Sequence, residues 1–359
     1  MTNRGECLAT CLSVSIILPI RNEAAYIKGC LKAIFAQDYS GELEILVVDG
    51  ISTDKTREII QEFISGYPQT NIRLLDNPDQ FMPPGFNRAL RQARGDVIIM
   101  LGGHAEIAPD YVRQCVNLLN ETKASCVGGA METIARDTVG KVIALAMSSP
   151  FGVGGVAFRT GQEMQREVDT AVFAAYRREV FEQIGGLDEE LIRNQDDEFN
   201  YRLRAYGGKI LFSPKIRSRY YSRANLGSLW RQYYQYGFYK VRVLQKHPRQ
   251  MSIRQFVPPL FVLALLFSAL LAFFPAIRFL SLTIPAVYLL ANLAASFLTT
   301  VRAQKSNQSS FTVYHSLLPF TFAILHISYG LGFLLGLFKF WNRWGDKTGK
   351  VPAWDNTIA

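Results

Sequence analysis

The sequence predicts an α/β domain with a mainly parallel sheet, followed by a C-terminal region of membrane-spanning helices. Up to about residue 198, short β-branched segments alternate with segments of helical periodicity, as in α/β proteins. From Phe256 onward, long apolar runs dominate the chain. Between Glu198 and Asp346 the sequence contains no Asp or Glu, and a basic block next to apolar runs is typical of attachment to a membrane.

Four strands are expected in the first part of the chain, with helices between them. The strands cover residues 13–20, 44–48, 72–75 and 97–101, and the helices cover residues 24–36, 52–63 and 86–93. Strands connected in this way form a parallel sheet with helices on both faces. Because ligands of such sheets bind beyond the carboxyl ends of the strands, residues 20–23, 49–53 and 102–106 are expected to surround one crevice.

Three apolar runs, residues 256–274, 277–298 and 311–338, each contain the roughly 20 apolar residues that span a bilayer. Three spans are the simplest interpretation, and the prolines in the first two runs leave a kinked or re-entrant pair as the alternative. Basic residues before residue 256 and in residues 299–310 predict that both segments are cytoplasmic. The basic tail contradicts this rule for three full spans. Membrane lipids are therefore expected partners, and nucleic acid is not.

Polar residues follow the first and second expected strands, in the segments Arg21-Asn22-Glu23 and Asp49-Gly50. A carboxylate at a strand end can accept hydrogen bonds from a ligand, and a glycine beside it lets backbone approach closely. A single Asp in this position is also common in turns and caps, so alone it does not identify a ligand site.

Together these segments resemble the nucleotide-binding elements of inverting family 2 glycosyltransferases with the GT-A fold. That family begins with Pro-x-x-Asn-Glu after a strand and continues with Val-Asp-(Asp/Gly)-x-Ser-x-Asp-x-Thr. The resemblance covers nearly all of residues 15–214. It implies a hexosyltransferase in which Pro19, Arg21, Glu23 and Asp49 contact the base and ribose of a nucleotide-sugar, usually a UDP-sugar.

The segment from Asn87 to Tyr111 resembles the family element that precedes and follows the fourth strand, and this implies that Asn87 also binds the donor. The family's metal-binding Asp-x-Asp is replaced by Gly102-Gly103-His104. His104 and the following Ala match the Asp-x-His-Ala motif of the succinoglycan-type exopolysaccharide branch.

These substitutions leave the cofactor open. Gly102 and Gly103 let backbone approach the donor diphosphate, and His104 with Glu106 can hold Mg²⁺ or Mn²⁺. A structural hydrogen bond is the alternative for His104. Lys and Arg side chains of residues 220–246 are an alternative to the cation itself.

The segment Gln195–Arg202 overlays the family's acceptor-side motif (Glu)-Asp-x-x-(apolar)-x-x-Arg. Sugar transfer with inversion needs a carboxylate that takes the proton of the acceptor hydroxyl. The resemblance implies that Asp196 is this catalytic base and that Asp197 lies on the acceptor side. An exposed acidic helix cap is the alternative.

Aromatic and basic residues alternate in residues 220–240, as in a helix at a membrane surface. The Gln-x-x-Arg-Trp motif of processive family members is absent from the sequence. Arg231 and Gln232 remain candidates for contact with the donor diphosphate or an acceptor phosphate, and a helix that only binds headgroups is the alternative.

The expected domains are an N-terminal extension (1–12), a GT-A domain (13–225), a juxtamembrane segment (226–255), a transmembrane region (256–340) and a tail (341–359). We expect an enzyme of exopolysaccharide or envelope-glycan synthesis in the inner or plasma membrane, with its catalytic domain in the cytoplasm. It moves a sugar from a nucleotide-sugar to a lipid-linked or membrane-proximal saccharide acceptor. A non-catalytic membrane scaffold that retains the fold is the alternative.

Overall fold

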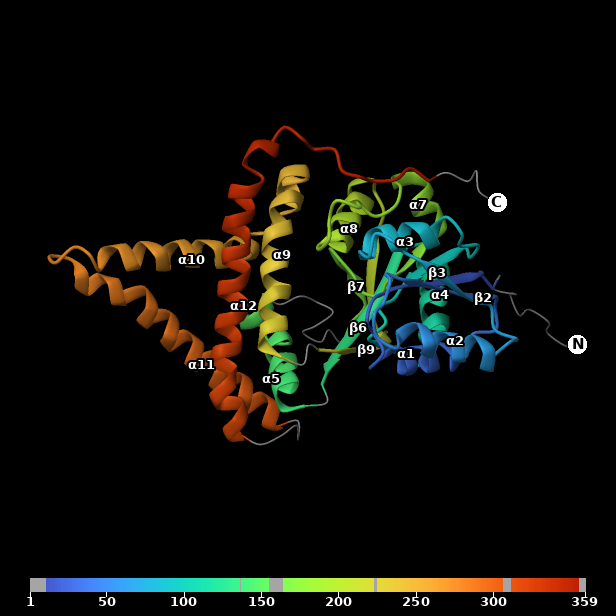
Figure 1. The fold of residues 1–359 in the computed structure, drawn as a ribbon, viewed down its shortest axis with the longest axis horizontal. Helices are drawn as coiled ribbons and strands as arrows, with labels where there is room; N and C mark the ends of the chain where they lie inside the picture. Colours follow the sequence, from blue (N-terminus) through green and yellow to red (C-terminus); the bar gives the residue numbers. More distant parts are fainter. Residues whose placement is uncertain (1–10, 136, 155–163, 223–224, 306–310, 355–359) are drawn as a thin grey trace, which may run out of the picture.

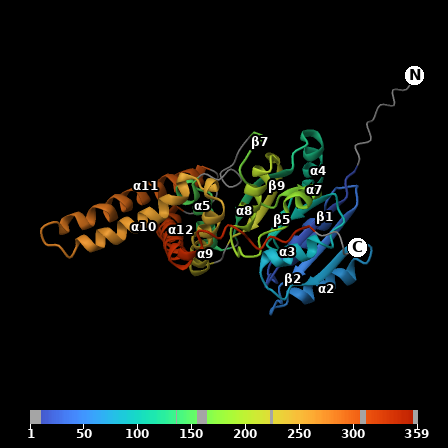
Figure 2. The ribbon, with the colours of Figure 1, turned by 90° about the horizontal axis from the view of Figure 1, so that it is seen from above.

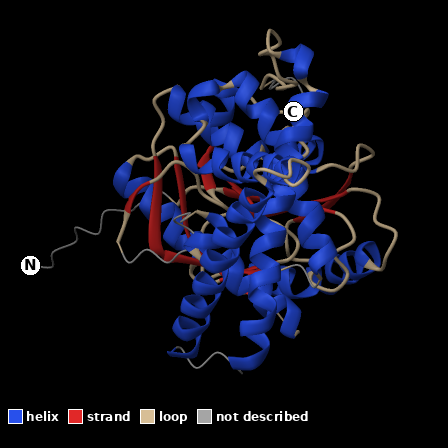
Figure 3. Ribbon diagram, turned by 90° about the vertical axis from the view of Figure 1, so that its left-hand side faces the viewer, coloured by secondary structure: helices blue, strands red, loops and turns tan. Residues whose placement is uncertain are grey.

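The chain folds into an α/β domain and a group of long helices beside it (Figure 1). A computed structural model describes residues 11–135, 137–154, 164–222, 225–305 and 311–354. Seen from the side of the long helices, helices cover most of the strands (Figure 3). Cys11, Cys30, Cys115 and Cys126 are free thiols, and the last three are buried.

The α/β domain is built on a nine-stranded mixed sheet with the order β3-β2-β1-β4-β8-β6-β9-β5, and β7 pairs with β9 outside this path. The strands are β1 (Val14–Ile20), β2 (Leu43–Asp49), β3 (Ile72–Asp76), β4 (Val97–Met100), β5 (Ala105–Ile107), β6 (Cys126–Ile134), β7 (Arg166–Glu167), β8 (Ala175–Arg177) and β9 (Ile210–Tyr221).

The expected parallel sheet is confirmed for the first four strands, since β1 pairs in parallel with β2 and β4, and β2 with β3. Antiparallel pairs enter at β8, which lies between β4 and β6, and at β5 and β7, which flank β9. These three strands have only two or three residues each, too few to show the alternation that identifies a strand in a sequence.

Helices cover both faces of the sheet, as expected of a sheet with parallel crossovers. One face carries α1 (Ile27–Phe35), α2 (Thr56–Gly66) and α4 (Tyr111–Thr122), and the other carries α3 (Met82–Leu90), α7 (Arg178–Ile184) and α8 (Gln195–Ala205). Successive side chains of β1 enter opposite cores: Ile16 and Leu18 pack in the first, and Ile17 packs in the second.

The second part contains α9 (Leu226–Lys246), α10 (Ile253–Leu271), α11 (Thr283–Lys305) and α12 (Phe311–Lys339), with short 3₁₀ turns at Pro248–Gln250, Arg278–Leu282 and Trp341–Arg343. Three helices in the described residues, α10, α11 and α12, are long and apolar enough to cross a membrane. In two views at right angles, α10 and α11 form a hairpin that projects away from the α/β domain (Figures 1 and 2).

The helix α12 does not follow the hairpin but runs beside α9 (Figure 1). The helices α5 (Thr138–Met147) and α6 (Pro150–Val153) of the α/β domain also pack on this pair. Val142 of α5, Leu229 of α9 and Phe322 of α12 are buried in one shared apolar cluster. The two parts of the protein are therefore joined by a continuous core.

The C-terminal tail returns from α12 to the α/β domain (Figure 1). The backbone of Gly186 donates to Pro352 O (3.0 Å), and that of Glu189 donates to Lys350 O (3.0 Å). Trp354 at its end packs on Phe181, with ring centroids 6.5 Å apart. The tail is thus part of the surface of the α/β domain, although the long helices separate it from that domain in the sequence.

Candidate active site

The loops after β1 and β2 lie at one edge of the sheet and bind each other. The backbone N–H of Asn22 donates to Ser52 Oγ (2.8 Å), and Asn22 Oδ1 accepts from the backbone of Thr53 (2.8 Å). The backbone N–H of Glu23 donates to Thr56 Oγ1 (2.8 Å). These hydrogen bonds therefore hold the two loops together, and the end of β2 lies beside them at the expected crevice.

Asp49 is fully buried at the end of β2. Its Oδ1 accepts a hydrogen bond from Ser52 Oγ (2.5 Å), and its Oδ2 accepts from Arg57 (3.0 Å). Arg57 also donates to Asp76 at the end of β3 (2.7 Å), and its bonds to Asp49 and Asp76 raise the pKa of Arg57. Arg57 was missed by the motif analysis, although it fixes the orientation of the carboxylate expected to read the nucleotide.

The other expected donor-binding residues lie in two different places. Arg21 is exposed in the loop after β1, beside half-buried Pro19. Asn87 is buried on α3, where it accepts from the backbone of Leu187 (2.8 Å) and donates to Leu187 O (2.8 Å) and Glu189 (2.9 Å). The amide of Asn87 therefore holds the loop that precedes α8, and its expected contact with the donor stays a prediction.

His104 lies after β4 with its Nδ1 2.7 Å from Glu23 Oε1. The glycine before it makes this contact possible, because a Cβ on Gly103 would lie 2.8 Å from Ile20 Cγ2 and 3.1 Å from Glu23 Cγ. At Gly102 a Cβ would meet Phe173 Cε1 at 3.4 Å, an ordinary contact distance. Gly103 is therefore required by packing, whereas Gly102 leaves space at the crevice.

Among the described residues, His104 and Glu106, the two expected cation ligands, form no hydrogen bond with each other. Glu106 Oε1 instead accepts a hydrogen bond from the Tyr221 hydroxyl (3.0 Å). Within the described ranges, no three His, Cys, Asp or Glu side chains gather as a metal-binding group. His104 fits a cation ligand, because a carboxylate on Nδ1 is the arrangement that turns Nε2 of a histidine toward a metal. The expected role of Glu106 beside it stays a prediction.

Asp196 lies in the first turn of α8, where it is half-buried and its Oδ1 accepts from the backbone of Asp197 (2.9 Å). Burial raises the pKa of Asp196, and the charge of Asp197 raises it further. Asp197 is bonded to Lys240 of α9, whose side chain is 3% exposed. Asp197 thus holds α8 against α9, and the expected roles of Asp196 as base and of Asp197 on the acceptor side stay predictions.

A chain of contacts places Asp196 at the same edge of the sheet as Asp49. Gln195, the residue before Asp196, donates to Met82 Sδ (3.6 Å) at the start of α3. Two residues earlier, Gln80 lies so close to the end of β2 that a Cβ on Gly50 would be 3.3 Å from Gln80 Cα. The two halves of the expected site thus meet across the segment that leads into α3.

Arg231 and Gln232 lie on the first half of α9. Arg231 is exposed. Gln232 is buried and donates to the Tyr236 hydroxyl (3.0 Å), while its buried Oε1 has no hydrogen-bond partner among the described residues. Because leaving such an atom unpaired costs free energy, Gln232 Oε1 is suited to accept a hydrogen bond from a bound ligand.

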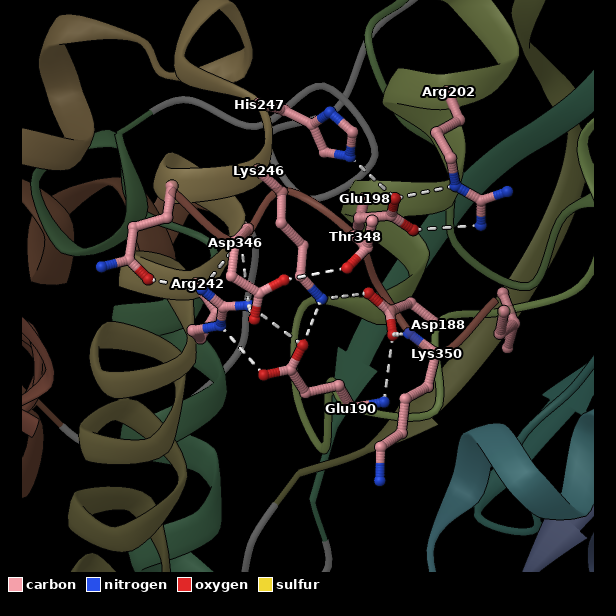
Figure 4. Close-up of polar contacts among 12 residues, drawn as sticks. Asp188, Glu190, Glu198, Arg202, Arg242, Lys246, His247, Asp346, Thr348 and Lys350 are labelled. Atoms are coloured by element: carbon pink, nitrogen blue, oxygen red, sulfur yellow. Dashed lines mark hydrogen bonds and ion pairs between the residues drawn. The ribbon is translucent and has the colours of Figure 1, made fainter. Parts of the chain in front are cut away.

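A buried charge network joins α8, α9 and the tail (Figure 4). Lys246 contacts Asp188 (2.5 Å) and Glu190 (2.6 Å), and Arg242 contacts Glu190 (2.9 Å). Although burial acts to raise it, hydrogen bonds from Arg242 and Lys246 hold the pKa of Glu190 at about 2. The tail joins the network through the backbone of Lys350, which donates to Asp188 (2.8 Å).

The basic residue of the acceptor-side motif has a structural role in this region. Arg202 grips the buried carboxylate of Glu198 with two hydrogen bonds (2.7 and 3.1 Å) and donates to Gly186 O (2.8 Å). His247 also contacts Glu198 (2.9 Å). The alternative of an exposed acidic cap is wrong for Glu198, which is 1% exposed.

Unusual backbone conformations concentrate around the crevice. Residues other than glycine with positive φ in these loops are Asn22 (55°), Ile51 (55°), Gln80 (64°), Phe173 (49°) and Asn194 (63°). For a β-branched residue such as Ile51 this region is a genuine outlier. Such conformations persist where the surrounding structure fixes them, and they are most frequent at functional sites.

Comparison with known proteins decides the family. The profile of glycosyl transferase family 2 matches residues 15–185. The chain is 33% identical over 265 residues to the succinoglycan biosynthesis protein ExoA of Rhizobium meliloti (strain 1021), covering 73% of this chain and 79% of that protein. The chain belongs to glycosyl transferase family 2. It is therefore a glycosyltransferase, and the expected enzyme class is confirmed.

A second relative and a solved structure are also similar to this chain. A dolichyl N-acetyl-α-D-glucosaminyl phosphate 3-β-D-2,3-diacetamido-2,3-dideoxy-β-D-glucuronosyltransferase of Methanococcus voltae is 32% identical over 240 residues, 65% of this chain and 74% of that protein. The solved structure of the mannosyltransferase PcManGT from Pyrobaculum calidifontis, in complex with GDP-Man and Mn²⁺, superimposes with a TM-score of 0.56 at 19% identity and covers 90% of this chain and 87% of that one. The expected GT-A fold is thereby confirmed.

Proposed function

We propose that this glycosyltransferase moves one sugar from a nucleoside diphosphate sugar to a lipid-linked saccharide, with inversion at the anomeric carbon. The observation that carries the proposal is Asp196, a carboxylate of raised pKa at the edge of the sheet where β2 ends. A general base of raised pKa is what deprotonation of a hydroxyl requires.

The reaction is a single displacement. Asp196 takes the proton of the acceptor hydroxyl while the hydroxyl oxygen forms a bond to the anomeric carbon. The bond from that carbon to the diphosphate breaks on the opposite face, so the configuration inverts and a nucleoside diphosphate leaves. Asp49, held by Arg57 and Ser52, binds the nucleoside part of the donor, and exposed Arg21 lies beside it.

A divalent cation would be held by His104 Nε2 together with the donor phosphates, since Mg²⁺ and Mn²⁺ bind through few protein ligands when phosphate oxygens are available. When bound, it would neutralise the charge that develops on the leaving diphosphate. The mannosyltransferase that shares the fold is described with Mn²⁺, which supports a cation in this fold.

Two observations support a lipid-linked acceptor. The Methanococcus relative is named for a dolichyl-linked sugar phosphate, a lipid-linked acceptor. In this chain, α9 contacts the base helix α8 through Asp197 and Lys240 and packs on the apolar helix α12. A lipid-linked sugar at a membrane surface is thus the acceptor that the position of Asp196 favours. Arg231 and Gln232 of α9 are its proposed phosphate and hydroxyl contacts.

The test of activity uses the purified full chain with labelled UDP- and GDP-sugars and a polyprenyl-diphosphate-linked saccharide. We expect label to move to the lipid fraction with one donor of the panel. A folded protein that binds nucleotide but transfers no sugar, and hydrolyses no donor, would instead support the non-catalytic scaffold.

Substituting Asp49→Ala should weaken binding of the nucleoside diphosphate by roughly 1–3 kcal/mol, because the nucleoside loses a buried hydrogen-bond acceptor. Isothermal titration with UDP and GDP measures the change. Asp38→Ala, which breaks an exposed pair between the loop after α1 and Arg113 of α4, is the matched control and should leave affinity unchanged. Equal affinities in both variants would remove Asp49 from the nucleotide site.

Substituting His104→Ala should raise the Mn²⁺ concentration that supports half-maximal transfer by at least about tenfold, the scale on which even supporting residues of metal sites act. Glu106→Gln is the control and should leave that concentration unchanged, because Glu106 is bonded to Tyr221. Electron paramagnetic resonance of Mn²⁺ with protein and nucleotide gives a readout independent of turnover. Full activity of the native chain in EDTA would contradict the cation and favour Arg231.

A further inference from the structure

We infer that only the α10–α11 hairpin crosses the bilayer, and that α12 lies flat along the membrane surface between the bilayer and α9. This divides the three apolar helices into two kinds: two that span and one that does not. It also places the tail on the same side of the membrane as the catalytic domain.

The first step is that both halves of α9 are bound to the catalytic domain, the first half through Leu229, which packs with α5, and the second half through polar contacts. Its side chains or backbone contact the loop before α8, α8 itself and the loop after α7, through the pairs Tyr236–Asn194, Lys240–Asp197, Arg242–Glu190 and Lys246–Asp188. These partners are charged and polar groups of a folded α/β domain. The axis of α9 therefore follows the surface of that domain and does not leave it.

The second step is that α12 is bound along α9 at backbone contact distance. A Cβ on Gly237 of α9 would lie 2.0 Å from Tyr329 O of α12, and one on Gly332 would lie 2.1 Å from Tyr234 O. Small residues of this kind allow the close helix packing found in membrane proteins. Further along, Gln245 donates to Phe340 O (2.7 Å), so the contact continues beyond the end of α12.

Together these steps exclude a membrane-crossing α12 in this structure. Helix α12 is fixed alongside α9, and α9 is fixed alongside the catalytic domain. If α12 crossed the hydrocarbon layer, the charged surface of that domain would have to enter the layer too, where unpaired polar groups are very unfavourable. The tail agrees with this, because Lys350 bonds to the catalytic domain at Asp188 directly after α12.

The hairpin has the opposite character. In α10 and α11, 17% of the most apolar stretch is buried inside the protein, against 44% in α12. Exposed side chains such as Leu266 (53%), Phe267 (59%) and Leu290 (68%) leave apolar surface around both helices. With 19 residues, α10 is about 28 Å long, close to the roughly 30 Å of the hydrocarbon layer. The hairpin projects away from the catalytic domain and from α12 (Figure 1).

The charges fit this arrangement and remove the conflict found in the sequence. Basic residues lie at the start of α10, at the end of α11 and in the tail, for example Arg254, Arg302 and Lys347. In the proposed topology all three positions are on the catalytic side. The turn between α10 and α11 carries Arg278 alone. A two-span hairpin therefore obeys the positive-inside rule throughout, whereas three spans do not.

Cysteine labelling separates the possible topologies. In the full chain with Cys7→Ser and Cys11→Ser, we place one new thiol at the hairpin turn (Ala276→Cys) or in the exposed tail (Lys347→Cys). An impermeant maleimide on intact cells should label the turn, and should label the tail only after permeabilisation. Labelling of the tail in intact cells, or protection of the turn, would overturn the inference.

Depth measurement tests α12 directly. Spin labels at Phe320→Cys and Phe338→Cys, both exposed on α12, are separated by about 27 Å along the helix axis. In liposomes we expect the two labels at equal depth within a few ångströms. Leu260→Cys and Leu270→Cys on α10 are the matched control and should differ by about 15 Å. A depth difference near 27 Å within α12 would show that it spans the bilayer.

Discussion

Replacement of Asp196 by Asn should lower sugar transfer by about 10²–10⁴-fold, the contribution of a positioned general base, while nucleotide affinity stays within a few-fold of the original. Asn has the shape of Asp but cannot take the proton of the acceptor hydroxyl. Transfer of labelled sugar to a lipid-linked acceptor at saturating donor measures the loss. A variant that retains more than about a tenth of the activity would move the base elsewhere.

The pH dependence of the native enzyme is a second test of Asp196. Burial raises the pKa of Asp196 above the ordinary value of 3.8, so kcat/KM should fall on acidification at a pH above that value. A carboxylate whose pKa is raised by folding costs stability when it is ionised, and that cost disappears as pH falls through its folded pKa. Asp196→Asn should therefore leave the neutral-pH stability unchanged or raise it.

Replacement of Lys246 by Met should destabilise the full chain by about 3–5 kcal/mol, because it leaves the carboxylates of Asp188 and Glu190 buried without their shared cation. Lys246 and Asp188 are 1% and 0% exposed in their side chains, so solvent screens this pair little. Thermal unfolding of the detergent-solubilised chain measures the change. Arg113→Met breaks the exposed pair with Asp38 and is the control, which should unfold like the native protein.

Acid should weaken the same network. The pKa of Glu190 is about 2 in the folded protein, against an ordinary value of 4.5. Its contribution to the free energy of unfolding is therefore fully present above pH 4.5 and is lost as the pH falls toward 2. The unfolding temperature of the native chain should fall over this range more steeply than that of Lys246→Met. Equal pH profiles for the two proteins would contradict a stabilising role for the network.

The part of the site that the sequence predicts is the part built from contiguous segments. Asp49 and His104 come directly after apolar strands, and parallel strands bring their carboxyl ends together, so their shared location follows from pattern alone. Asp196 was identified by a motif on a single helix. In each case a local pattern carries the relevant information.

What the sequence does not predict depends on contacts between distant residues. Asn87 lies 100 positions from its partner Leu187, and Lys350 lies 162 positions from Asp188. No periodicity links such pairs, so the structural role of Asn87 and the return of the tail could not be inferred. The three apolar helices were expected from composition, but their different orientations depend on packing between α9 and α12.

We propose that the chain is an inverting transferase with a lipid-linked acceptor. The most direct measurement is the anomeric configuration of the linkage that the full chain forms, determined by nuclear magnetic resonance on the lipid-linked product from the donor accepted in the nucleotide-sugar panel. A configuration opposite to that of the donor is expected from a single displacement with Asp196 as base. Retention of the donor's configuration, or donor hydrolysis without any lipid-linked product, would contradict the account.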